Sequence, residues 1–100
     1  MSGLADIIDR SLRLALLRVL ADPDLNYRAN SAVLHGVATS LGFHVSRDKV
    51  HSTLDWLREQ GLIEIEDLGN VRIAKLRARG IDVALGAATV TGVDRPTPGI

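Results

Sequence analysis

Basic and hydrogen-bonding side chains gather in two stretches of the chain, and their chemistry suits the recognition of a nucleic acid. The first stretch opens a predicted helix and contributes four side chains, Arg47, Lys49, His51 and Ser52. The second stretch holds four basic residues and no acid within eight positions, namely Arg72, Lys75, Arg77 and Arg79. Guanidinium and ammonium groups neutralise phosphates, and arginine also forms paired hydrogen bonds with guanine in the major groove. These residues predict a surface that binds double-stranded DNA, with Arg28 as a further candidate for a phosphate contact.

Acidic residues close to both stretches argue against that prediction. Asp48 and Asp55 are expected on the same helix face as Arg47, where a carboxylate would repel the DNA phosphates. Three more acids line the strand that follows, at Glu64, Glu66 and Asp67. The 100 residues balance 12 Lys and Arg against 12 Asp and Glu, and a net charge of zero provides no long-range attraction for DNA. Any contact with nucleic acid would be local, and the alternative is that each basic residue is a solvated surface charge.

Other kinds of chemistry find little support in the residue types. The chain has no cysteine, which excludes a disulfide, a thiolate metal site and a thiol nucleophile. None of His35, His44 and His51 stands four positions from another, the spacing of a helical metal site. The chain also has no glycine-rich phosphate loop and no serine in a nucleophile elbow. We therefore expect no metal, no cofactor and no enzymatic activity.

The spacing of apolar residues predicts the elements that position these side chains. A period of three and four indicates four helices, over residues 4–21, 31–41, 47–60 and 76–88. Asn30 or Ser31 caps the second helix after a polar loop, and Ser46 caps the third. Between the last two helices the period changes to two, and a turn at residues 68–70 joins two strands into a hairpin.

The predicted first helix is apolar around most of its circumference. One stripe has the spacing of a buried face and contains Leu4, Ile8, Leu12, Ala15, Leu16 and Val19. Three apolar residues lie off that stripe, at Ile7, Leu14 and Leu17. Such a helix is either central to the fold or packs on a second surface, and we expect a homodimer through these three residues. Charged residues interrupt the helix, so it predicts neither a membrane span nor a signal peptide, and the cytoplasm is the expected compartment.

This order of elements predicts an α+β domain, mostly helical, of the winged helix-turn-helix type. The domain is expected over residues 1–88, with three helices, a two-stranded wing and a C-terminal helix. Residues 89–100 contain two prolines and few large apolar side chains, and we expect an extended C-terminal tail. In this fold the third helix is presented outwards, and its first turns enter the major groove.

Two segments, and then nearly the whole chain, resemble known families. Residues 46–63, from a cap serine to the Arg-Glu-Gln-Gly-Leu-Ile ending, resemble the recognition helix and wing entry of ArsR-type repressors. Residues 76–84 are similar to the Leu-Thr-x-x-Gly start of the last helix in many winged-helix regulators, with Arg77 in place of the threonine. Nearly the whole chain resembles a small family of Mu-like phages and prophages. The shared motifs lie at residues 26–30, 45–48, 56–57 and 92–96.

The resemblance implies a phage-derived winged-helix protein that binds DNA as a small transcriptional regulator in the bacterial host. The metal-sensing role of many ArsR proteins is not implied, because the thiolate ligands are absent. The alternative is a non-enzymatic interaction module in phage assembly or DNA packaging that binds another phage protein. In that case the apolar first helix and the proline-containing tail would carry the function.

Overall fold

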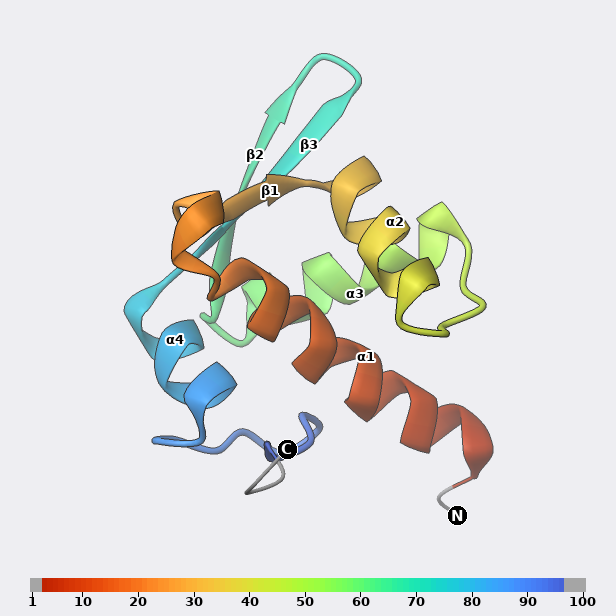
Figure 1. Cartoon of the computed structure of the whole chain (residues 1–100), viewed down its shortest axis with the longest axis vertical. Coiled ribbons are helices and arrows are strands. Elements are labelled where there is room, and N and C mark those ends of the chain that lie inside the picture. The colour runs from red at the N-terminus through yellow and green to blue at the C-terminus, as the bar shows by residue number, and fades with distance from the viewer. Residues whose placement is uncertain (1–2, 97–100) are drawn as a thin grey trace.

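A computed structural model describes residues 3–96, which form four α-helices and a three-stranded antiparallel sheet (Figure 1). In chain order these elements are α1 (Leu4–Leu20), the 3-10 helix η1 (Pro23–Leu25), β1 (Arg28–Asn30), α2 (Ser31–Ser40), α3 (Arg47–Glu59), β2 (Ile63–Leu68), β3 (Val71–Leu76) and α4 (Ala78–Leu85). The predicted α+β class with a helical majority is confirmed. None of the helices in the described part of the chain has the length and apolar character needed to cross a membrane.

Local capping signals set the ends of α2, α3 and α4. The side chain of Asn30 accepts a hydrogen bond from the backbone of Val33 at 2.8 Å, and Ser46 accepts one from Lys49 at 3.0 Å. These bonds satisfy backbone donors that have no partner inside the helix. The last helix is shorter than predicted because β3 continues to Leu76 and Gly86 ends α4 in the left-handed conformation, with φ at 85°.

The sheet has one strand more than the predicted two-stranded hairpin. β2 and β3 pair as expected around a turn at Gly69 and Asn70, but β1 lies on the other side of β3, so the order is β1-β3-β2. The prediction of a polar loop for the whole segment before α2 is therefore wrong. Three residues are too few for their alternation to be recognised in the sequence.

The two faces of the sheet have different surroundings, because successive side chains of a strand point to opposite sides. The face toward the helices, here called the helix-side face, carries the buried side chains of Ile63, Ala74 and Leu76. The opposite face, here called the outer face, carries Glu64 and Lys75, which stand opposite each other in register and are exposed.

Leucines of α1 form the centre of the core, and α1 contacts α2, α3, α4 and β3. The fully buried leucines of this helix are Leu12, Leu16, Leu17 and Leu20. They pack with Leu34 of α2, Leu54 and Leu57 of α3, and Leu62 before β2. The expectation that Leu17 lies at a dimer surface is corrected here, because its side chain has no exposed area.

The residues that follow α4 return to α1 and dock on it. Asp94 accepts a hydrogen bond from the hydroxyl of Ser11 at 3.0 Å, and the carbonyl of Gly92 accepts one from Arg13 at 2.9 Å. Gly92 has φ at 98° and lies against Trp56, so close that a β-carbon there would come within 2.8 Å of the indole ring. The predicted tail is therefore held in place up to residue 96, while residues 97–100 lie outside the described part.

Candidate nucleic-acid interface

Of the four DNA-binding residues predicted on α3, two are exposed and two are bonded to residues of other helices. Arg47 and Ser52 are exposed, together with the acidic Asp48. The ammonium group of Lys49 lies 2.6 Å from the Asp9 carboxylate on α1, so this cation is paired inside the molecule. The pair joins the start of α3 to α1, and the sequence does not predict that these two residues meet.

His51 is also engaged within the chain. Its Nε2 atom is hydrogen-bonded at 2.9 Å to the hydroxyl of Ser31, the first residue of α2. Ser31 is buried, with 4% of its surface exposed, and a buried hydroxyl needs such a partner. His51 therefore ties α3 to α2, and this ring nitrogen is not available to a base edge.

Arg72 lies on the helix-side face and is held by two carboxylates. Its Nε donates to Asp67 at 3.0 Å, and its Nη1 donates to Asp55 of α3 at 3.0 Å. The side chain is 21% exposed. The hydrogen bond that Arg72 donates to Asp67 raises the pKa of Arg72. Burial lowers this pKa, and the negative charges of Asp55 and Asp67 raise it further. Asp55 also lies 3.4 Å from the guanidinium of Arg58.

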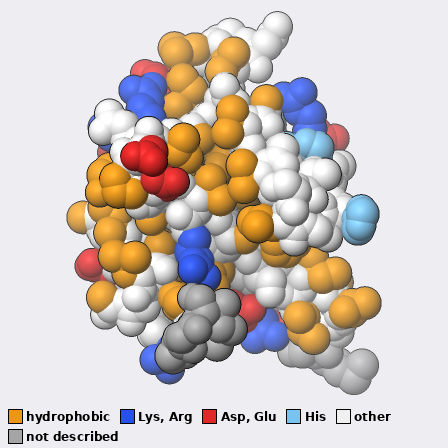
Figure 2. Space-filling view, in the orientation of Figure 1, with side chains coloured by type: hydrophobic (Ala, Val, Ile, Leu, Met, Phe, Trp, Pro, Cys, Tyr) orange, Lys and Arg blue, Asp and Glu red, His pale blue; other side chains and the backbone are white. Residues whose placement is uncertain are grey.

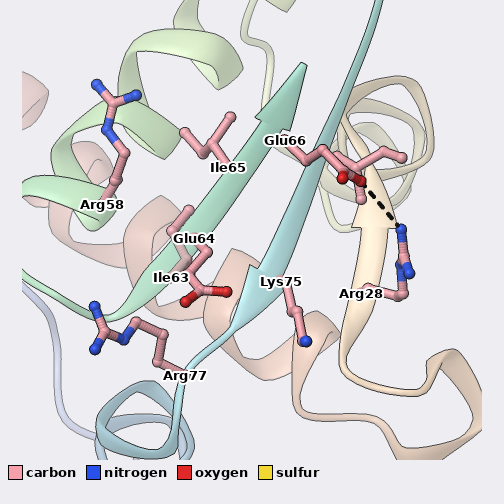
Figure 3. A pocket seen from close by; sticks show the side chains of 9 residues that line it. Arg28, Arg58, Ile63, Glu64, Ile65, Glu66, Lys75 and Arg77 are labelled. Atoms are coloured by element: carbon pink, nitrogen blue, oxygen red, sulfur yellow. Dashed lines mark ion pairs between the residues drawn. The ribbon is translucent and has the colours of Figure 1, made fainter. Parts of the chain in front are cut away.

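The other members of the basic run lie away from Arg72. Lys75 and Arg77 line a groove of about 600 Å³ that runs from the outer face over the edge strand β2 toward the end of α3. We call it the sheet groove (Figure 3). Its lining residues are Arg28, Arg58, Ile63, Glu64, Ile65, Glu66, Ile73, Lys75 and Arg77.

Four cations and two carboxylates thus face the sheet groove. Arg28 of β1 and Lys75 of β3 are partners in register, and Glu64 of β2 is opposite Lys75 on the other side. Arg28 lies 3.7 Å from Glu66, an exposed pair drawn as the dashed line in Figure 3. The excess of positive charge in the groove suits a phosphate-bearing ligand. Arg58 is not among the predicted site residues, although its place one turn before the hairpin is visible in the sequence.

The predicted site residues do not form one continuous surface. Arg47 stands at the beginning of α3, whereas Arg77 and Arg79 stand at the beginning of α4, on the opposite side of the molecule in Figure 1. Arg79 is exposed on α4 and lies outside the sheet groove. The structure brings Lys75 and Arg77 together with Arg28 and Arg58, and it separates this group from the start of α3.

The other residues that the sequence singles out contact neighbouring parts of the fold. His35 Nε2 is hydrogen-bonded to the carbonyl of Val45 at 2.9 Å, which fixes the turn between α2 and α3. Trp56 stacks under the guanidinium of Arg13, 3.9 Å from the ring centre. Within residues 3–96, no three histidine or acidic side chains come together as metal ligands would. Of the expected dimer residues, Ile7 is 49% exposed and Leu14 is half-buried against the core.

Comparison with known proteins yields two relatives. The chain is 43% identical over 93 residues to gp26, an uncharacterized protein of Escherichia phage Mu, and the match covers 93% of this chain and 95% of the phage protein. It is 40% identical over 63 residues to an uncharacterized protein of Haemophilus influenzae, covering 63% of this chain and 60% of the relative. No family model matches the chain, and no solved structure matches it.

Proposed function

The chain belongs to the family of Mu-like phage proteins that includes gp26 of phage Mu, and on that premise we propose a winged-helix protein that binds double-stranded DNA. The succession α1-β1-α2-α3-β2-β3 supports the winged helix, since a short turn joins α2 to α3 and a hairpin follows α3 directly. Arg47 and Ser52 are exposed at the start of α3, which is the part of a recognition helix that contacts base edges. The proposed role is non-enzymatic, as a small regulator in the bacterial host.

The sheet groove is the observation that carries this proposal. Its four cations come from β1, α3, β3 and the residue before α4, so the fold itself gathers charges that are distant in sequence. Arg28 and Arg58 are paired with Glu66 and Asp55, whereas Lys75 and Arg77 form no ion pair within residues 3–96. These two cations attract phosphates locally even in a chain of zero net charge. We assign phosphate contacts to Arg28, Arg58, Lys75 and Arg77, and a separate contact to Arg47.

A salt titration of binding to a random-sequence DNA duplex tests the assignment. We expect the affinity to fall steadily between low and moderate salt, because each phosphate contact releases counterions. Lys75→Ala and Arg77→Ala should each lower the salt dependence by about one contact. Arg79→Ala is the matched control, since Arg79 is exposed but outside the groove, and it should leave the salt dependence unchanged. Absence of binding at low salt, or an affinity that salt does not change, contradicts the proposal.

A second candidate is a protein-interaction module in phage assembly or DNA packaging. It is favoured by the internal pairing of Lys49 with Asp9 and of Arg72 with Asp55 and Asp67, which removes two cations from the DNA-binding set. In this case a phage protein should co-purify with the chain from induced lysogens and should remain bound after nuclease treatment. A complex that nuclease dissolves supports DNA binding instead.

A further inference from the structure

A second groove lies on the face of the molecule that Figure 2 shows, between α1, η1 and α2. Its volume is about 630 Å³, and we call it the helix groove. The lining residues are Ala15, Arg18, Val19, Asp22, Leu25, Val33, Val37 and Leu41. Six of these eight are apolar, and hydrophobic side chains are prominent on this face in the space-filling view. The groove is separate from the sheet groove and shares no residue with it.

The apolar lining follows from the way α2 packs. This helix turns Leu34 and Ala38 into the core, where both are buried. Val33, Val37 and Leu41 are spaced four apart, so they form a second stripe along the helix that the core does not cover. Val33 is 44% exposed and Leu41 is 58% exposed. These side chains keep apolar area exposed to water along the groove.

Two opposite charges at the rim indicate what covers the groove. Arg18 is in the last turn of α1 and Asp22 follows four positions later, and both side chains are exposed. A two-fold axis between two copies places the same patch against itself, so each charge on one copy meets a residue of the same patch on the other. A patch that carries one cation and one anion is complementary to itself in such a pairing.

We propose that the helix groove is the contact surface between two copies of this chain, with Arg18 of each copy paired to Asp22 of the other. The apolar stripe of α2 is then buried between the copies, together with Val19 and Ala15 of α1. The net charge of zero assists the association, because the two copies do not repel each other at long range. This dimer does not depend on DNA binding.

The proposed surface differs from the one expected from the sequence. Leu17 is inside the core and Leu14 packs against it, which leaves Ile7 as the exposed member of the expected set. The sequence does not predict an interface on α2. Leu34 and Ala38 already account for the buried face that the apolar spacing of α2 predicts. That Val33, Val37 and Leu41 form a second, uncovered stripe is visible only in the folded structure.

Sedimentation velocity of the full chain, from low micromolar to millimolar concentration, tests the surface. We expect the unmodified chain to form a dimer, and Leu41→Glu to raise the dimer dissociation constant by more than about 100-fold by placing a carboxylate in an apolar contact. Leu85→Glu is the matched control, because Leu85 is 70% exposed on α4, away from the groove, and it should leave the dimer intact. A monomer at millimolar concentration, or equal dissociation of both variants, overturns the proposal.

A charge exchange tests the paired geometry. Arg18→Asp alone and Asp22→Arg alone should each raise the dissociation constant about tenfold, because each creates like charges across the axis. An equal mixture of the two variants should restore the dimer, since both rim acids of one copy then meet both rim arginines of the other. Asp22 also accepts the backbone N–H of Asp24, so thermal unfolding must first show that Asp22→Arg is folded. A mixture that is no stronger than the single variants overturns the pairing.

Discussion

Arg72 and Lys75 are close neighbours on β3, yet they lie on opposite faces of the sheet. Arg72 is on the helix-side face between Asp55 and Asp67, and its side chain is 21% exposed. Lys75 is on the outer face, exposed in the sheet groove. The pleat of the strand separates them, because their odd spacing sends the two side chains in opposite directions. Like charges that follow one another along a strand therefore divide between the two faces of the sheet, where their neighbours differ.

The difference assigns different roles to residues of the same type. Side chains on the helix-side face contribute to the stability of the fold, because they are buried or paired there. Side chains on the outer face contribute little to stability and are available to a ligand. The same substitution should therefore have unequal effects on the two faces.

Two isoleucines give the largest contrast. Ile63→Ala on the helix-side face should lower the free energy of unfolding by about 3 kcal/mol, because it leaves a cavity where the side chain is 1% exposed. Ile73→Ala on the outer face of β3 should lower it by about 1 kcal/mol or less, because this side chain is only half-buried. Urea unfolding of both variants measures the difference. Equal losses would mean that the two faces are equally packed.

Substitution of Arg72 and of Lys75 should give the next largest difference in stability. Arg72→Met should lower the free energy of unfolding by about 1 kcal/mol, because Asp55 and Asp67 lose the partner that binds both of them. Lys75→Met should change it by less than about 0.5 kcal/mol, and it should weaken DNA binding instead. The same unfolding series and the DNA titration measure both quantities. The comparison fails if Lys75→Met is the more destabilising change.

Removing the two carboxylates that pair with Arg72 should make its guanidinium available to DNA. The double variant Asp55→Asn with Asp67→Asn frees the guanidinium and deletes two negative charges near the hairpin. We expect the affinity for duplex DNA to rise about threefold at moderate salt, with a steeper salt dependence. The double variant that also carries Arg72→Met is the control, and it should lose the part of the gain that comes from the freed cation.

The smallest effect is expected at the exposed pair of the sheet groove. Glu66→Gln releases Arg28, whose guanidinium lies 3.7 Å from the carboxylate. The free energy of unfolding should change by less than about 0.5 kcal/mol, because exposed pairs contribute little. The DNA affinity should rise about twofold. A loss of affinity would show that Glu66 itself contacts the ligand, which contradicts the phosphate-binding role of the groove.

The helices and the hairpin are predictable from the sequence because their signals are local. Ser46 and Asn30 cap their helices within three residues, and polar and apolar residues alternate from Ile63 to Glu66 and from Val71 to Ile73. β1 is not predictable in this way, because three residues pair with a strand more than 40 positions away. The burial of Leu17 follows from a core that surrounds α1 on several sides, which the helix pattern alone does not reveal.

The candidate site is less predictable than the fold. The pairing of Lys49 with Asp9 joins residues of different helices, and no spacing in the sequence predicts it. The basic run is visible in the sequence, and its division between two faces follows from the strand period once the strand is known. The entry of Arg58 into the groove depends on how α3 meets β2, which is a matter of tertiary packing.

The docking of the C-terminal segment on α1 has an optical consequence. Trp56 is the single tryptophan of the chain, and it is enclosed by Arg13 on one side and Gly92 on another. Its fluorescence therefore reports on one junction, where α1, α3 and the last described residues meet. Release of the segment exposes the indole to water and shifts its emission to longer wavelength, while the helical circular dichroism is retained. The protein thus contains its own probe for whether its C-terminal segment is in place.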